Sequence, residues 1–79
     1  MLKVGNLIEV IDQIDPSIRT QGTIRYIEPD FDIGGEWLYV RANDESLNTI
    51  QHPMIPGGYF TMFNSLQTDR FIDLNVKEL

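Results

Sequence analysis

Two strand-like segments near the beginning of the chain constrain the fold more than any other feature. In residues 6–11, Ile8 and Val10 occupy alternate positions, which is typical of a strand with one buried face. Residues 23–27 follow Gly22 and are rich in the β-branched and aromatic side chains that favour strands. The connection between them, residues 12–21, is polar and contains Pro16, which lacks a backbone donor and interrupts a strand ladder. We therefore predict two strands joined by a long loop, in which Ile18 is a candidate inward-facing residue.

The phase of the apolar residues predicts an irregularity in the second strand. Ile24 and Ile27 are three residues apart, which breaks strict alternation and indicates a β-bulge or a sharp bend. The next strand, residues 37–41, is the clearest in the chain because its alternation is regular. We expect Leu38 and Val40 to face the core, which places Trp37, Tyr39 and Arg41 on the opposite face.

The rest of the chain supplies two more strands and several connections. Residues 59–63 form the fourth predicted strand and residues 71–76 the fifth, which carries Ile72, Leu74 and Val76 on one face. The predicted connections are a turn over residues 28–36, a turn over 43–46, a helical turn or irregular connector over 47–50, an ordered loop over 51–58 and a short 3₁₀ turn within 64–70.

The length of 79 residues predicts a single domain, residues 1–79, with one small core. The chain has no cysteine, so its stability cannot depend on disulfides or thiolate metal sites. No segment approaches the ~20 apolar residues of a membrane helix, and the first residues lack the apolar segment of a signal peptide. We therefore expect a cytoplasmic protein that does not bind membranes.

The charge is strongly acidic. Twelve acidic and six basic residues give a net charge of -6, and the basic residues are scattered singly along the chain. Nucleic-acid binding depends on clustered Lys and Arg that contact phosphates, so this composition disfavours it.

The first two predicted strands resemble a KOW-type arrangement within an SH3-like small barrel. The resemblance covers about the first third of the chain and rests on Gly5, Asn6, Ile8 and Val10, followed by Gly22 and Ile24. It implies a single five-stranded SH3-like barrel with long loops and at most a short 3₁₀ turn, with partners bound by loops or by an exposed sheet face. Members of this group bind RNA, DNA, ribosomes or proteins. The acidic balance and the Asp15-Pro16 pair of the first loop depart from the KOW pattern.

The sequence contains no set of residues that predicts catalysis or a cofactor. The one histidine, His52, precedes a proline in a predicted loop, and the nearest acids in sequence, Asp44 and Glu45, belong to a turn, so we interpret His52 as an ordinary loop residue. No His or Cys pair has metal-ligand spacing, and no glycine-rich phosphate loop precedes a helix. The acids around Asp30 and Asp32 lack the spacing of a calcium loop, which favours solvated turn acids. We predict a protein that is not an enzyme and has no metal or cofactor.

The candidate binding region is acidic and aromatic. Four acidic residues and no base lie between Arg25 and Arg41, beside aromatic residues that are typical of binding anchors. The predicted partner-binding residues are Tyr26, Glu28, Asp30, Asp32, Glu36, Trp37, Tyr39, Met54 and Ile55. Two interpretations of the aromatic face remain open. It is an exposed interface, or it is covered by the loop over 51–58 through Met54 and Ile55.

These observations lead to three functional hypotheses. The first is a protein-binding module that docks a basic protein through residues 28–41, as an accessory subunit or as a phage or mobile-element inhibitor whose carboxylates replace phosphates. The second is a KOW-like domain associated with nucleic acid or ribosomes, with Arg25 and Arg41 as phosphate contacts. The third is a structural subunit of a larger assembly that pairs an open strand edge. The oligomeric state stays open.

Overall fold

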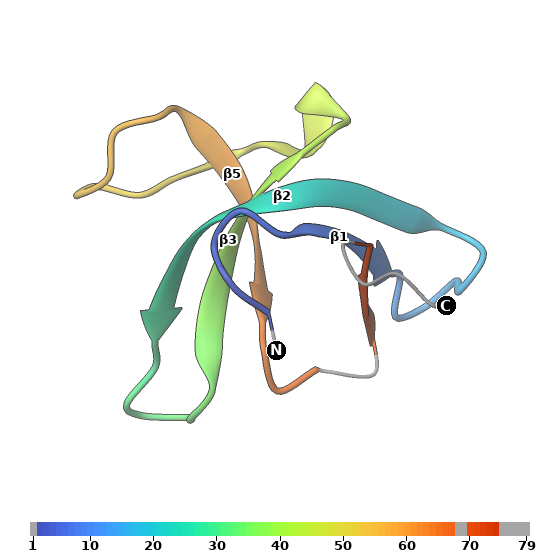
Figure 1. Cartoon of the computed structure of the whole chain (residues 1–79), viewed down its shortest axis with the longest axis horizontal. Helices are drawn as coiled ribbons and strands as arrows, with labels where there is room; N and C mark the ends of the chain where they lie inside the picture. Colours follow the sequence, from blue (N-terminus) through green and yellow to red (C-terminus); the bar gives the residue numbers. More distant parts are fainter. Residues whose placement is uncertain (1, 68–69, 75–79) are drawn as a thin grey trace.

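One antiparallel sheet accounts for most of the structure. The computed structural model describes residues 2–67 and 70–74. Its elements are β1 (Leu7–Ile11), β2 (Arg19–Pro29), β3 (Glu36–Ala42), the 3₁₀ turn η1 (Glu45–Leu47), β4 (Ile50–Gln51), β5 (Tyr59–Asn64) and β6 (Phe71–Asp73). The strand order is β4-β5-β3-β2-β1-β6, and Figure 1 shows that the long strand β2 bends along its length. The prediction of an all-β chain is confirmed, and none of the described residues forms a helix long and apolar enough to cross a membrane.

The number of strands differs from the prediction. The sheet has six strands rather than five, because Ile50 and Gln51 pair with Phe60 and Tyr59 at its edge. Such a short strand is set by tertiary pairing and leaves no pattern in the sequence. Among the described residues the sheet is open, since β4 and β6 are its two edges and do not pair with each other. The strand pairing therefore does not show the closed five-stranded barrel that we predicted.

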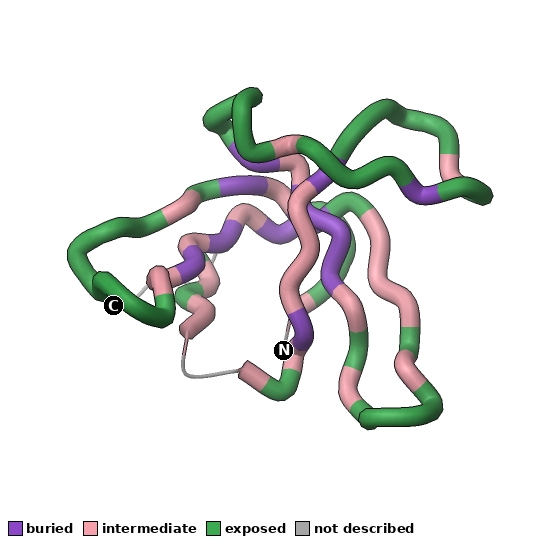
Figure 2. Tube along the Cα trace, turned by 180° about the vertical axis from the view of Figure 1, so that it is seen from behind, coloured by how far each residue is buried: buried purple, intermediate pink, exposed green. Residues whose placement is uncertain are grey.

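The core lies on one face of the sheet. Its buried residues are Ile8, Val10, Ile24, Leu38 and Val40. They come from three neighbouring strands, and Figure 2 shows the buried residues along the strands and the exposed ones mainly in the connections. The predicted inward orientation of Leu38 and Val40 is confirmed.

The predicted bulge is also confirmed. The pairing of β2 with β3 shifts between Ile24 and Tyr26, which leaves Arg25 without a cross-strand partner. The shift brings Ile27 opposite Leu38 on the core side, although Ile24 and Ile27 are three residues apart.

The strand β2 begins earlier than predicted. Residues 19–21, which we assigned to the loop, pair with β1. On the exposed side of this pair, Glu9 Oε1 accepts a hydrogen bond from Arg19 Nη1 at 2.9 Å and Glu9 Oε2 accepts one from Gln21 Nε2 at 3.0 Å. These cross-strand bonds stabilise a polar strand end that propensity alone does not indicate. The expectation that Ile18 faces inward is wrong, because its side chain is exposed.

The C-terminal strand is described over three residues. Phe71 packs against the core, whereas Ile72 and Leu74 are partly exposed. Val76, the end of the predicted strand over 71–76 and positions 68–69 of the predicted turn over 64–70 lie outside the described residues. The helical turn predicted over 47–50 occurs two residues earlier, as η1.

Candidate functional site

The strand β3 separates the core from a second layer of side chains, which we call the outer face. It consists of Tyr26, Glu28, Trp37, Tyr39, Arg41 and Phe60. Residues directly opposite each other in an antiparallel pair share a face, and the register pairs Tyr26 with Tyr39 and Glu28 with Trp37. The outer face is therefore formed by alternate residues of β3 and by the residues of β2 that the bulge turns to the same side.

Tyr39 is the centre of a buried aromatic cluster on this face. Its ring centroid lies 5.0 Å from that of His52, 5.9 Å from that of Tyr26 and 6.1 Å from that of Phe60. These separations are typical of favourable tilted and edge-to-face ring contacts. Tyr39 retains only 7% of its exposure, so its ring is not available at the surface.

The loop over residues 51–58 covers the aromatic cluster, but through His52 and not through Met54. His52 is 8% exposed, whereas Met54 is 83% exposed and Ile55 is partly buried. We had interpreted His52 as an ordinary loop residue. The sequence contained a signal for this contact. His52 is the one aromatic ring in residues 51–58, the segment that one of the two interpretations places over the aromatic face.

Hydrogen bonds fix the orientation of the His52 ring. The backbone amide of Met54 donates to His52 Nδ1 at 3.0 Å, so the neutral ring carries its proton on Nε2. That atom lies 3.5 Å from Glu28 Oε1, while the Tyr39 hydroxyl donates to Glu28 Oε2 at 3.3 Å. Burial raises the pKa of the Tyr39 hydroxyl, and the nearby Glu28 carboxylate adds to this effect.

Arg41 holds the other end of the same loop. Its Nη2 donates to the carbonyl of Gly57, and its guanidinium carbon lies 5.0 Å from the centroid of the Phe60 ring. The contact with Phe60 is a cation–π interaction. Arg41 is thus engaged inside the structure, whereas Arg25, the other base considered for phosphate binding, is exposed at the bulge.

The acidic turn between β2 and β3 is organised by Asp30. Its carboxylate accepts hydrogen bonds from the amides of Asp32 at 2.9 Å and Ile33 at 3.0 Å, and from Trp37 Nε1 at 2.8 Å. These hydrogen bonds lower the pKa of the Asp30 carboxyl, with the Ile33 amide as the largest cause. Gly34 and Gly35 both have positive φ, a conformation that glycine adopts without strain. The turn is therefore ordered by its own residues.

The tip of this turn presents apolar side chains that are not among the predicted partner-binding residues. Phe31 is 93% exposed and Ile33 is also exposed, while Asp32 and Glu36 beside them are exposed acids. We define residues 30–36 as the hairpin tip. The sequence signal was the alternation Phe-Asp-Ile inside a glycine-ended turn, where neither apolar residue is needed by a strand pattern.

The structure divides the predicted binding residues into groups. Tyr26, Glu28 and Tyr39 come together around His52, and Asp30 contacts Trp37. Exposed positions on the hairpin tip and on the covering loop are held by Asp32, Glu36 and Met54. Among the described residues, no group of three or more His, Cys, Asp or Glu side chains is arranged to hold a metal ion.

Comparisons with known proteins add no assignment to this geometry, since no family model, no curated protein and no solved structure matches the chain.

Proposed function

We propose that this chain is a non-enzymatic protein-binding module that docks a basic protein through its hairpin tip, residues 30–36. The single observation that carries the proposal is the 93% exposure of Phe31 on a turn that internal hydrogen bonds hold in place. An exposed aromatic ring on an ordered turn costs little conformational entropy to bind, and aromatic anchors dominate the energy of many interfaces.

The charge around Phe31 favours a basic partner. Asp32 and Glu36 are exposed on the same hairpin, and the Glu28 side chain is 41% exposed at its base. No lysine or arginine occurs between Arg25 and Arg41. A concentrated acidic surface steers a basic partner toward the apolar anchor and raises the rate of association. The same surface suits an accessory subunit or an inhibitor that occupies the nucleic-acid site of its target.

The aromatic cluster has a supporting part in this proposal. Because Tyr39 is buried beneath His52, the anchors are Phe31 and Ile33, and the outer face holds the base of the hairpin in place. An SH3-like scaffold is consistent with this arrangement, since the last described strand pairs with the first beside a meander of β1, β2, β3 and β5. We therefore propose an SH3-like scaffold together with this binding function.

The test is affinity capture from the native host with the wild-type chain and two matched variants. Phe31→Ser removes the proposed anchor, whereas Ile14→Ser removes an apolar side chain that is equally exposed, at 93%, on the loop between β1 and β2. We expect the Phe31 variant to lose the basic partner and the Ile14 variant to retain it. Asp32→Asn combined with Glu36→Gln should weaken capture and reduce its dependence on salt.

Capture of every partner by the Phe31 variant at the wild-type level would refute the proposal. Loss in the Ile14 variant alone would instead place the interface on the loop over residues 12–18. Dispersed amide spectra of each variant would establish that the substitution has not unfolded the chain.

A further inference from the structure

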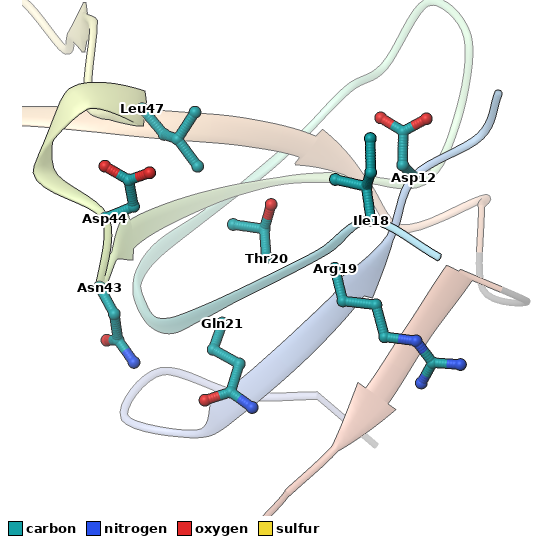
Figure 3. A pocket seen from close by; sticks show the side chains of 8 residues that line it. All are labelled: Asp12, Ile18, Arg19, Thr20, Gln21, Asn43, Asp44 and Leu47. Carbon is teal, nitrogen blue, oxygen red and sulfur yellow. The ribbon is translucent and has the colours of Figure 1, made fainter. Parts of the chain in front are cut away.

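A groove lies at the end of β2 farthest from the hairpin tip. Its volume is about 480 Å³, and it is lined by eight residues, which are Asp12, Ile18, Arg19, Thr20, Gln21, Asn43, Asp44 and Leu47. Figure 3 shows Leu47, Thr20 and Ile18 between the carboxylates of Asp44 and Asp12. The hairpin tip follows the last residue of β2, whereas the groove involves its first residues, so the two surfaces are separate.

The floor of the groove is apolar and accessible. Ile18 and Leu47 are both exposed, at 55% and 40%, although they are aliphatic. Thr20 lies between them in Figure 3 and is opposite Val10 in the sheet, so its side chain is on the same face as this core residue. An apolar side chain of a partner would remove this surface from water.

The two carboxylates at the ends of the groove are held in fixed positions. Asp12 Oδ1 accepts hydrogen bonds from the amides of Ile14 and Asp15, both at 2.8 Å. Asp44 Oδ1 accepts hydrogen bonds from the amide and the hydroxyl of Ser46, at 3.0 and 2.6 Å. In both residues, Oδ2 forms no hydrogen bond to another described residue. Each turn thus fixes one oxygen and leaves the second available to a ligand.

The charges near the groove favour cations. The turn hydrogen bonds lower the pKa of both carboxyls, so Asp12 and Asp44 are ionised at neutral pH. The neighbouring Arg19 extends away from the floor in Figure 3 and pairs with Glu9 at 2.9 Å. Arg70, on the Asp12 side, donates to the carbonyl of Ile11 and to Gln67, and its positive charge also contributes to the lowered pKa of Asp12. Neither guanidinium group donates a hydrogen bond to Asp12 or Asp44, so the second oxygen of each carboxylate can still pair with a cation, with the Asp44 end the less compensated of the two.

We propose that this groove binds an extended peptide segment in which one apolar side chain lies between two basic side chains. The apolar side chain rests on Ile18, Thr20 and Leu47, and the basic side chains pair with the free oxygens of Asp12 and Asp44. This site does not depend on the hairpin tip, so either surface can function without the other.

The test is a titration of ¹⁵N-labelled protein with a capped peptide, Gly-Lys-Gly-Leu-Gly-Lys-Gly, followed by amide chemical shifts. Alternate side chains of an extended peptide point to the same side, so this spacing presents Leu and both Lys to the groove together. We expect saturable shifts at residues 12, 18–21 and 43–47. The peptide Gly-Glu-Gly-Leu-Gly-Glu-Gly should cause none, because its charges repel both carboxylates.

Matched variants locate the interaction. Asp12→Asn combined with Asp44→Asn keeps the turn acceptors but removes both charges, and it should weaken binding by about fivefold. Asp15→Asn is the control, since this acid lies in the same loop and bonds to Ser17 instead of lining the groove. It should bind as the wild type does. Ile18→Thr, which leaves both turns intact, should also weaken binding.

Three outcomes would overturn the proposal. They are an absence of saturable shifts at millimolar peptide, equal binding by the Asp12/Asp44 double variant, and shifts confined to residues 30–36. The last would show that basic peptides use the hairpin tip, which would support the proposed function and not this site. Shifts in the groove, combined with wild-type capture by the Phe31→Ser variant, would support this site and refute the proposed function.

Discussion

The two faces of β3 bury side chains of different chemistry by different means. Leu38 and Val40 enter a cluster of buried aliphatic side chains that comes from strands paired directly with one another. Tyr39, on the other face, is buried among rings that also carry a hydroxyl, an imidazole and a nearby carboxylate. The first face is covered by Leu2, Phe63 and Phe71, which pack against the aliphatic cluster, and the second is covered by a loop.

This difference predicts separate roles for the two faces. The first sets the global stability of the chain, and the second sets the position of the loop over residues 51–58. The aliphatic face gains free energy from apolar area alone, which needs no directional contact. The outer face combines apolar contact with hydrogen bonds that fix where the loop over 51–58 begins and ends. Changes on the first face should therefore unfold the chain, whereas changes on the second should release the loop.

Leu38→Ala should have the largest effect. The side chain is fully buried, so its truncation leaves a cavity and should lower the free energy of unfolding by about 3 kcal/mol. That is most of the ~3 to 5 kcal/mol expected of a core this size. Urea unfolding followed by Trp37 emission measures the change. A loss below about 1 kcal/mol would mean that the aliphatic face is not the main source of stability.

Arg41→Lys should mainly affect the loop. Lysine lacks the planar guanidinium that contacts the Gly57 carbonyl and the Phe60 ring together. We expect amide exchange at Met54 and Ile55, whose amides donate to His52 within the loop, to rise by about tenfold, with a global loss of about 1 kcal/mol or less. Arg25→Lys, at the exposed bulge, is the matched control and should change neither quantity. Equal effects on the loop and on global stability would contradict the separation of the two faces.

Tyr39→Phe should cost less. It removes one hydroxyl and its bond to Glu28 but keeps the ring contacts, so the free energy of unfolding should fall by about 0.5 to 1 kcal/mol. Tyr26→Phe is the control, because the Tyr26 hydroxyl forms no hydrogen bond to another described residue. A double-mutant cycle with Glu28→Gln would isolate the coupling between hydroxyl and carboxylate. Because the Gln side-chain oxygen can still accept a hydrogen bond, additive effects would show that the negative charge of Glu28 adds nothing to the strength of this contact.

The smallest effect concerns pH and the hairpin tip. The pKa of Asp30 is lower in the folded chain than its ordinary value of 3.8, so the ionised carboxylate stabilises the fold above that pH. Its contribution is lost as the pH falls from about 4 through the lower folded pKa. Asp30→Asn should reduce this part of the acid destabilisation, measured by urea unfolding between about pH 5 and 2. Asp32→Asn, a change at an acid that accepts none of the turn hydrogen bonds, should leave the pH profile closer to wild type.

Local alternation was sufficient to predict much of the fold. It gave the strands around Ile8, Leu38 and Phe60, and the spacing of Ile24 and Ile27 gave the bulge. It could not give β4, because a two-residue edge strand exists only where its partner is already in place. It also missed the start of β2, since that pairing depends on bonds to Glu9 from the neighbouring strand.

The candidate site was less predictable than the fold. The acidic and aromatic composition of residues 28–41 was visible in the sequence, but the side chains exposed there depend on tertiary contacts. Alternation placed Tyr39 opposite the core, whereas only the return of the chain at His52 buries it. Phe31 is exposed because Asp30 closes the turn with backbone hydrogen bonds, a geometry that depends on the two glycines after it.

The bulge at Arg25 also restricts how related sequences can differ in length. Arg25 is the extra residue, so its deletion would leave Ile24 and Ile27 two positions apart and keep the later side chains of β2 on their present faces. Regular pairing at the present length would instead turn those side chains to the opposite faces. Glu28 would then point into the aliphatic core, and Ile27 would point toward the histidine. Between Gly22 and Pro29, the loss of one residue should therefore be tolerated only where it removes the bulge, whereas the exposed connections should tolerate gains and losses more freely. In any set of relatives, the length of that interval would show whether the bulge is present, even where the residues themselves have changed.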